Sequence, residues 1–365
     1  VGDADQSIYG WRGADINNIL DFEKDYPEAK LIRLEQNYRS TKKILSAANA
    51  VIEHNVNRKK KELWTNNVVG ASIGVYQARD EWDEARFIAD TIGKDKAEHV
   101  FTYGDIAILY RTNAQSRVIE ETFMRMGLPY TMVGGLKFYD RKEIKDILAY
   151  LRVIYNPLDS ISMMRIINVP KRGLGATSLV HLTNFAAENN ASIFDIIANP
   201  EMLNAVPSLT ARAKKTMQEF AAFLIMKMGK ASSLHIDQLI EEVLEDSGYF
   251  KELEVDKKPE SQTRIENLKE FIGVARDFEK QEGQEATLEN FLAQLSLVSD
   301  IDNAELADDR VTMMTLHAAK GLEFPCVFLV GMEEGIFPNQ RTLLDPEEIE
   351  EERRTCYVGI TRAER

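Results

Sequence analysis

The fold is decided by residues 105–110, which read Asp-Ile-Ala-Ile-Leu-Tyr. A short apolar run of this kind predicts a buried strand. Residues 115–126, which follow it, show the pattern of a helix. Strands that alternate with helices are typical of a parallel sheet. We therefore expect an α/β fold built on a parallel sheet.

The alternation of strands and helices continues on both sides of this stretch. The other expected elements are strands at 31–35, 72–77, 311–316 and 326–331, helices at 41–55 and 79–93, and a last helix from near Pro346. The helix at 41–55 is indicated by five apolar residues on one face, namely Ile44, Leu45, Ala48, Val51 and Ile52. The last helix carries Glu350 and Arg354 at the spacing of a helical ion pair.

From about residue 140 to residue 300 the pattern is helical throughout. Turn signals such as Asn156-Pro157 and Asn199-Pro200 separate the segments. The expected helices are 141–155, 160–167, 177–189, 208–228, 234–246, 259–281 and 287–297. The simplest arrangement is an α/β domain with a large all-helical insertion, in which the stretches before and after the insertion share one sheet.

Size and composition set the broad class of the protein. A chain of 365 residues is too long for one ordinary core, and no apolar run approaches the length of a membrane span. Cys326 and Cys356 lack metal-type spacing, so we expect two reduced thiols in a cytoplasmic protein. The net charge of −14 argues mildly against nucleic acid, but binding depends on local basic clusters, which occur at residues 58–61 and 171–172.

The first of four segments with chemically useful side chains is residues 2–14. It follows a strand end, where open α/β sheets bind ligands, and Gln6 could orient an attacking water there. Tyr9 and Trp11 are two residues apart beside Arg12, so both rings could form a platform for stacked bases. The alternative is that both rings belong to the core.

The second segment is residues 34–41. Arg39 lies at a strand-to-helix turn, where it could reach a phosphate, and Tyr38 offers a ring face for a purine. Ser40 or Thr41 could cap the following helix. The alternative is a surface arginine and a packing tyrosine.

The third and fourth segments lie near the end of the chain. In residues 314–324, His317 and Lys320 precede a glycine at a strand end, which suits a phosphate backbone, although His317 could equally be structural. In residues 357–363, Arg362 could act as an arginine finger, although nothing local distinguishes it from a solvated helical arginine.

In this order, the four segments resemble motifs III, IV, V and VI of superfamily 1 DNA helicases of the UvrD/PcrA/Rep family. The matching residues are Gln-Ser-Ile-Tyr-x-Trp-Arg-Gly-Ala at 6–14, Asn-Tyr-Arg-Ser at 37–40, Thr-Leu-His-x-x-Lys-Gly-Leu-Glu at 315–323 and Val-Gly-x-Thr-Arg-Ala at 358–363. Residues 133–141 and 169–175 resemble the PcrA branch of Gram-positive bacteria most closely.

The resemblance implies a P-loop NTPase fold in which two RecA-like domains clamp ATP. It divides the chain into the tail of the first domain (1–39), the second domain (40–138 and 301–365) and the helical insertion (139–300). The sequence contains no phosphate loop of the form G-x-x-x-x-G-K-[ST] and no Asp-Glu pair for Mg²⁺, and the family carries both upstream. We therefore expect a piece of a longer protein that uses ATP with Mg²⁺, inactive as an ATPase by itself and without a metal site of its own.

The resemblance also assigns roles to single residues around ATP. Gln6 would sense the γ-phosphate, and Arg39 and Arg362 would contact it from the second domain. Tyr38 would stack on adenine, and Glu323 would bind the ribose.

Other residues are assigned to DNA by the same resemblance. Tyr9 and Trp11, with Arg12 beside them, would stack on single-stranded bases, and His317 and Lys320 would link nucleotide to DNA. Duplex phosphate would be held at a helix start by backbone N–H groups of a short loop. The loop residues are Lys171, Arg172, Gly173 and Gly175.

The leading hypothesis is an ATP-dependent 3′-to-5′ DNA helicase of repair and replication. Its expected partners are single-stranded and duplex DNA and proteins of repair or replication, with no membrane. A second hypothesis is the helicase part of a nuclease–helicase of the AddA/RecB kind. A third is a module that binds duplex DNA or a protein without ATP.

Overall fold

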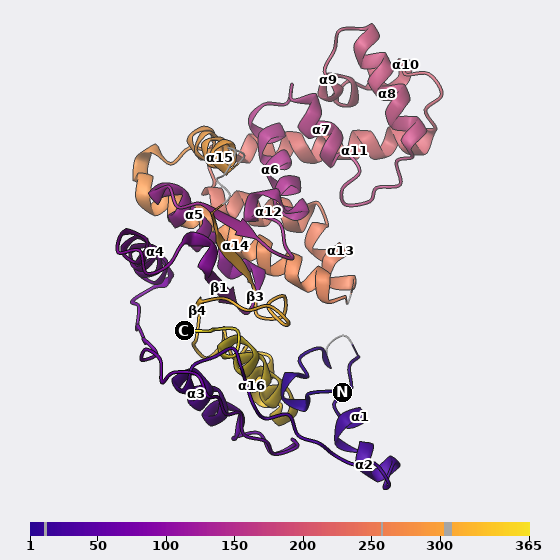
Figure 1. Cartoon of the computed structure of the whole chain (residues 1–365). Coiled ribbons are helices and arrows are strands. Elements are labelled where there is room, and N and C mark those ends of the chain that lie inside the picture. Colours follow the sequence, from indigo (N-terminus) through magenta and orange to yellow (C-terminus); the bar gives the residue numbers. More distant parts are fainter. Residues whose placement is uncertain (11–12, 257, 303–308) are drawn as a thin grey trace. The chain divides into compact units, whose positions relative to one another are not determined.

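The computed structural model describes residues 1–10, 13–256, 258–302 and 309–365. Trp11 and Arg12 lie outside the described residues. The chain forms two compact units (Figure 1). The first comprises Val1–Lys137 and Ala304–Arg365, and the second comprises Phe138–Asn303.

The first unit is built on a sheet of four parallel strands in the order β2-β3-β1-β4. The strands are β1 (Ile106–Tyr110), β2 (Tyr130–Met132), β3 (Val311–Thr315) and β4 (Cys326–Leu329). In the register, Leu109 of β1 lies opposite Met314 on one side and Leu329 on the other. Strands from before and after the helical segment therefore share one sheet, and the predicted parallel α/β fold is confirmed.

The central strand β1 is buried on both faces, and its side chains alternate between two cores. Ile106, Ile108 and Tyr110 pack in one cluster, together with side chains of α4 (Glu81–Ala97) and α5 (Ser116–Met126). Ala107 and Leu109 pack in the other cluster, which Cys356 of α16 (Pro346–Ile360) also contacts. Helices therefore cover both faces, as a parallel sheet requires.

The remaining helices of the first unit lie outside this three-layer core. They are α1 (Asn17–Leu20), α2 (Phe22–Asp25) and α3 (Lys42–Ile52). Helix α3 packs on α16, where Ala48 and Ile52 contact Tyr357. The predicted helical pair on α16 is present as well, with Glu350 and Arg354 3.8 Å apart.

Two strand predictions in this unit are wrong. Residues 31–35 and 72–77 are extended, but in the described chain neither joins a ladder, and only Gln36 forms an isolated bridge, to Trp64. Their apolar side chains stay at the surface, with Leu34 75% and Val75 93% exposed. Alternating apolar residues become a strand only when a neighbouring strand supplies hydrogen bonds. The sequence also failed to indicate β2, which has only three residues.

The second unit is all-helical, as predicted. Its helices are α6 (Lys142–Tyr155), α7 (Ser160–Ile166), α8 (Ala176–Glu188), α9 (Ile193–Ala198), α10 (Pro200–Ala205), α11 (Ala211–Lys230), α12 (Ile236–Asp246), α13 (Tyr249–Val255), α14 (Pro259–Glu282) and α15 (Leu288–Asp302). One large core includes side chains of α6, most of whose residues are buried. The sequence did not indicate α9, α10 and α13, which are at most seven residues long and too short to show a helical period.

The second unit also buries a charge. The side chain of Lys227 on α11 is fully buried, and its ammonium group lies 2.6 Å from Glu242 and 2.6 Å from Asp246. Two carboxylates compensate the cost of removing this cation from water, so α11 and α12 are joined by charge as well as by apolar contacts.

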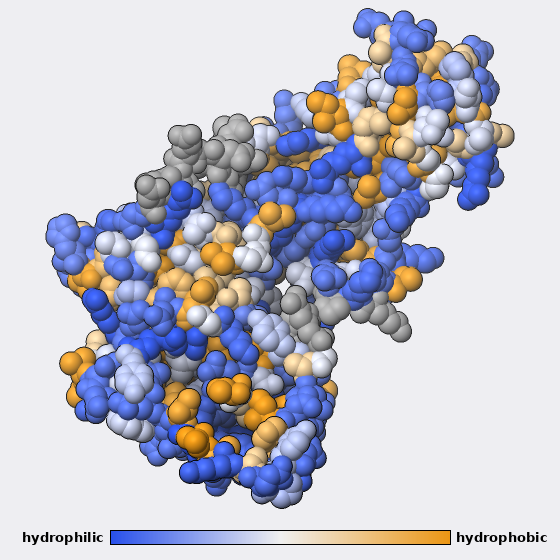
Figure 2. All heavy atoms as spheres, turned by 45° about the vertical axis from the view of Figure 1, so that its right-hand side comes forward, coloured by the Kyte–Doolittle hydropathy of each residue, from blue (hydrophilic) through white to orange (hydrophobic). Residues whose placement is uncertain are grey.

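Hydrophobic side chains lie among mostly hydrophilic ones in the view of Figure 2, and no described helix is long and apolar enough to cross a membrane. Both cysteines are free thiols, as predicted. Burial raises the pKa of Cys326 to about 12 and that of Cys356 to about 11, so both stay protonated and weakly nucleophilic at neutral pH.

Gly359 allows α16 to lie directly on the sheet. A Cβ atom there would be 2.4 Å from a methyl carbon of Leu316 and 3.0 Å from one of Leu329. Gly93 on α4 is the contrasting case, because a Cβ atom there would meet nothing within 4 Å.

We predict that Gly359→Ala lowers the free energy of unfolding by up to about 2 kcal/mol, because overpacking a core usually costs roughly 1–3 kcal/mol. The gain of about 1 kcal/mol that alanine brings to a helix offsets part of this cost. Gly93→Ala, the matched control, should instead stabilise the protein slightly. Urea unfolding followed by circular dichroism measures both, and equal effects of the two substitutions would contradict this account of α16.

Candidate functional site

A cavity of about 530 Å³ lies in the first unit. Its lining residues come from three places in the sequence and are Gln36, Asn37, Tyr38, Arg39, Glu323 and Glu364. The volume is in the range of small-molecule sites. The structure therefore brings together Tyr38, Arg39 and Glu323, which sequence analysis assigned to one nucleotide.

A turn holds Arg39 in place at the cavity. The carboxamide oxygen of Asn37 accepts hydrogen bonds from the backbone N–H groups of Arg39 and Ser40, both at 2.9 Å. The guanidinium of Arg39 donates to Glu323 at 2.6 Å and to the carbonyl oxygen of Thr361 at 3.0 Å. Ser40 donates to the carbonyl oxygen of Ala363 at 2.6 Å. The second and fourth motif segments are thus joined by direct hydrogen bonds.

The helix after this turn is capped by backbone groups. Thr41 occupies the N-cap position of α3, but its side chain makes no capping hydrogen bond. The carbonyl oxygens of Val68 and Val69 instead accept from the first N–H groups of the helix, both at 3.1 Å. Thr41 therefore takes the predicted N-cap position without the side-chain cap, because the segment that follows α3 folds back over the start of the helix.

The Tyr38 ring is available to a flat ligand. Its side chain is 77% exposed, and its hydroxyl donates to the side-chain oxygen of Gln36 at 3.0 Å. This hydrogen bond holds the hydroxyl end of Tyr38, while the ring faces open space. An exposed ring fixed at the edge of a cavity is a stacking surface for a base.

Arg362 lies beside the cavity but does not line it. Its residue is 3% exposed, and its guanidinium donates to the carbonyl oxygens of Val358 and Leu322 and to the hydroxyl of Thr361, each at 3.0 Å. Burial and then the nearby charge of Arg39 lower the pKa of Arg362 to about 10, so it stays charged at neutral pH.

Glu323 and Glu364 line the cavity together with Arg39, and Arg362 lies beside it. Arg39 pairs with Glu323, whereas Arg362 forms no ion pair with the described residues. Bringing an anion to these two guanidinium groups would compensate a buried positive charge.

A second cluster forms where the first motif segment meets the third. The hydroxyl of Tyr9 donates to the carbonyl oxygen of His317 at 3.0 Å, and the two ring centres are 5.8 Å apart. Lys320 donates to the carbonyl oxygen of Gln6 at 2.8 Å and lies 5.3 Å from the centre of the Tyr9 ring. The structure thus brings together four predicted residues from the two ends of the chain. The side chain of Gln6 donates to Asp3 at 2.8 Å and does not line the cavity.

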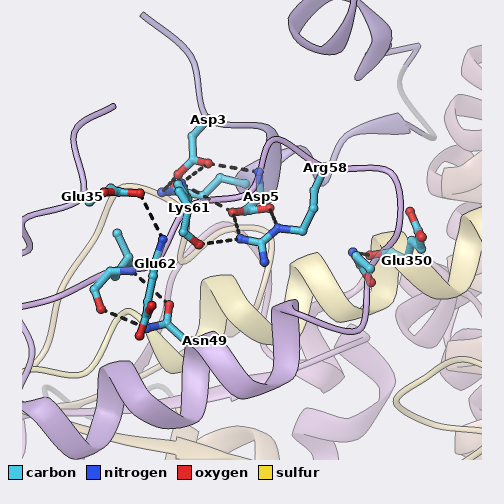
Figure 3. A network of polar contacts seen from close by, with 11 residues as sticks. Asp3, Asp5, Glu35, Asn49, Arg58, Lys61, Glu62 and Glu350 are labelled. Carbon is cyan, nitrogen blue, oxygen red and sulfur yellow. Dashed lines mark hydrogen bonds and ion pairs between the residues drawn. The ribbon is translucent and has the colours of Figure 1, made fainter. Parts of the chain in front are cut away.

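The basic run at 58–61 is partly engaged inside the fold, whereas Lys60 is exposed. Figure 3 shows Arg58 and Lys61 directed toward two aspartates of the first segment. Arg58 donates to both carboxylate oxygens of the buried Asp5, at 3.0 and 2.8 Å, and Lys61 donates to Asp3. These cations fix residues 3–5 in place.

In the second unit, the loop at 171–175 is held together from within. The guanidinium of Arg172 donates to the carbonyl oxygen of Ile166 at 2.9 Å and to the Tyr150 hydroxyl at 2.6 Å, and it lies 4.3 Å from the centre of the Phe220 ring. The Arg172 side chain therefore holds the loop in shape, whereas the resemblance assigned phosphate binding to the backbone N–H groups of the loop.

The backbone of this loop is partly engaged, because the Lys171 N–H donates to the Glu252 carboxylate at 3.0 Å and the Arg172 N–H donates to the Asn168 side-chain oxygen at 2.8 Å. Lys171 is exposed, and Gly173 has a φ of 76°, which favours glycine. Gly175 is the N-cap of α8 and supplies no side-chain cap. The first N–H groups of α8 therefore remain suited to an anion.

Among the described residues, no group of three or more His, Cys, Asp or Glu side chains is arranged to hold a metal ion. Sequence analysis also missed several positioning residues. The roles of Asn37, Glu351 and Arg354 leave no local signal, although Asn37 belongs to the second motif segment and Arg354 to the predicted helical ion pair. Only the folded chain shows which backbone groups they contact.

Two family models of helicases match this chain. A family model described as the UvrD-like helicase C-terminal domain matches residues 32–365, and one described as the UvrD/REP helicase N-terminal domain matches residues 1–27.

Proteins named ATP-dependent DNA helicase PcrA are similar over the whole chain. Those of Staphylococcus epidermidis and Staphylococcus aureus are each 54% identical, and that of Bacillus subtilis is 52% identical. The chain covers 50%, 50% and 49% of them, so it spans about half the length of these relatives. The predicted resemblance is confirmed, and the chain belongs to the UvrD-like helicase family.

Proposed function

We propose that this chain forms part of the motor of an ATP-dependent 3′-to-5′ DNA helicase that acts in repair and replication in the bacterial cytoplasm. Residues 1–39 would end the first RecA-like domain, residues 40–138 and 301–365 would form the second, and residues 139–300 would form the insertion. The observation that carries this proposal is the cavity at Tyr38, Arg39 and Glu323, beside the buried charge of Arg362.

The described residues fit a nucleoside triphosphate. The Tyr38 ring would stack on the base, and the Glu323 carboxylate would accept hydrogen bonds from the ribose. Arg39, now paired with Glu323, would exchange part of that pairing for the terminal phosphate, and Arg362 would add a second positive charge. Bound ATP with Mg²⁺ supplies the phosphoanhydride that is hydrolysed. Its phosphate loop and metal ligands would come from the preceding part of the longer protein, and the chain alone would be inactive.

The second cluster supports a role in binding single-stranded DNA. Tyr9 would stack on a base, and Lys320 would add positive charge beside it. Trp11 and Arg12 would extend this surface, and Gln6 would sense the state of the nucleotide. His317 would link the two sites through the hydrogen bond from Tyr9 to its carbonyl oxygen.

The helical insertion is proposed to bind duplex DNA. Lys171 and the backbone N–H groups at Gly173, Gly175 and the start of α8 would contact phosphates, while Arg172 would hold the loop in shape. Proteins of repair or replication are further proposed partners of the longer protein.

In the full-length protein, we predict that Arg39→Ala and Arg362→Ala each lower kcat of the DNA-stimulated ATPase by roughly 10³-fold, the usual effect of losing a cation at a transferring phosphate. KM for ATP should change much less. A steady-state ATPase assay with saturating single-stranded DNA measures both. Arg86→Ala, an exposed arginine on α4, is the matched control and should retain full activity.

Arg362 is buried, so its alanine variant needs a test of folding. The variants Arg39→Lys and Arg362→Lys keep the positive charge and serve as folding controls. Their circular dichroism spectra should match that of the wild type. Full ATPase activity of folded Arg39→Ala would refute the assignment of the cavity. Full activity of folded Arg362→Ala would remove Arg362 from the site.

In the full-length protein, we predict that Lys171→Glu weakens binding of a DNA duplex about tenfold at low salt and reduces the slope of log K against log salt by about 1, as the loss of one phosphate contact requires. Lys269→Glu, the same charge reversal at an exposed residue of α14, is the control. Fluorescence anisotropy with a labelled duplex at several salt concentrations measures both. Equal effects of the two substitutions would show that only net charge matters.

A further inference from the structure

The first motif segment is held by side chains from the far end of the chain. Its short helix η1 (Ala4–Gln6) contacts α16, and Ile8 is fully buried. Hydrogen bonds from Arg58 and Lys320 hold Asp5 and the Gln6 carbonyl group. Two further hydrogen bonds join this segment to α16, and neither belongs to a residue assigned to ATP or DNA.

The first of these contacts is made by Glu351. Its side-chain oxygen accepts a hydrogen bond from the backbone N–H of Gly10 at 3.1 Å. Burial raises the pKa of Glu351, whereas the Gly10 N–H and the charge of Arg354 act in the opposite direction. A Cβ atom at residue 10 would lie 2.3 Å from the second carboxylate oxygen, so any other residue there would displace the Glu351 carboxylate.

The second contact is made by Arg354, three residues further along the same helix. Its guanidinium donates to the carbonyl oxygen of Ser7 at 2.8 Å, and the residue is only 6% exposed. Residues three apart lie on one face of a helix. One face of α16 therefore holds the backbone on both sides of Tyr9, at Ser7 and at Gly10.

The same helix reaches the nucleotide cavity at its other end. Thr361, the C-cap of α16, accepts a hydrogen bond from Arg39 through its carbonyl oxygen, and Arg362 follows it. A helix is stiff over this length, so a displacement at one end is transmitted to the other. The two sites share α16 as a common support.

We propose that Glu351, together with Arg354, is a positioning residue that fixes the Tyr9 segment for single-stranded DNA and links it through α16 to the nucleotide site. This inference rests on the proposed function. Both residues act on backbone atoms of this segment, at Gly10 and Ser7. Loss of Glu351 would free the turn at Gly10, so single-stranded DNA would bind to a less ordered surface.

The test uses the full-length protein and its ATPase activity at increasing concentrations of oligo(dT). Glu351→Ala should raise KM for the oligonucleotide roughly tenfold, the size of one charged hydrogen bond, and leave kcat at saturating DNA within about twofold. Glu351→Gln keeps a hydrogen-bond acceptor of the same shape and should restore KM to within about twofold. Glu347→Ala, an exposed glutamate in the first turn of α16, should have no effect.

Gly10→Ala provides a second, independent test from the other side of the contact. It should raise KM as Glu351→Ala does, because the new methyl group displaces the carboxylate. The double variant should be no worse than the worse single variant, since both changes break one contact. Additive effects would overturn the proposal.

Other outcomes are equally decisive. An unchanged KM for Glu351→Ala, or a fall in kcat and melting temperature without a change in KM, would show a structural role only and overturn the proposal. Failure of Glu351→Gln to restore KM would also overturn it, because charge rather than position would then matter. A wild-type protein without DNA-stimulated ATPase activity would refute the proposed function itself, and this inference with it.

Discussion

The structure of the first unit depends on the hydrogen bonds that β1 receives from β3 and β4. Both partner strands follow the whole helical segment in the sequence, so the central strand is completed only when the two ends of the α/β part meet. Once they meet, the segment after β3 lies beside the first motif segment, and α16 packs on the sheet. The cavity at Arg39 and the cluster at Tyr9 both follow from this closure.

The sequence predicted the parts of this arrangement that leave a local pattern. The burial of Ile108 and the α/β alternation were visible, and the motif resemblance named Tyr38, Arg39 and Glu323 before the cavity was known. What it could not predict were contacts between side chains and distant backbone groups. Arg172 and Arg362 have the appearance of open cations in the sequence, yet carbonyl oxygens of neighbouring loops bind both. A loop has no periodic sequence pattern from which its path could be predicted.

Charge in this protein is used locally. The net charge of −14 does not predict the local charge at either site, because several cations are bound to partners inside the fold. Arg58 and Lys227 neutralise carboxylates, and Arg354 holds a backbone carbonyl group. Arg362 differs from them, since a buried guanidinium with only neutral partners among the described residues is costly unless an anion joins it. The buried charge of Arg362 beside the proposed nucleotide site therefore destabilises the fold.

The helical unit occupies the chain between β2 and β3, which are neighbouring parallel strands. Parallel neighbours always need a crossover connection, and a single helix usually provides it. Here an entire helical unit takes the place of that one helix. The sheet constrains only the two ends of the connection, which begins after β2 and ends before β3. The structure between these two ends is free to vary. The domain could therefore have gained, enlarged or exchanged this unit during evolution without any change in the order of its strands.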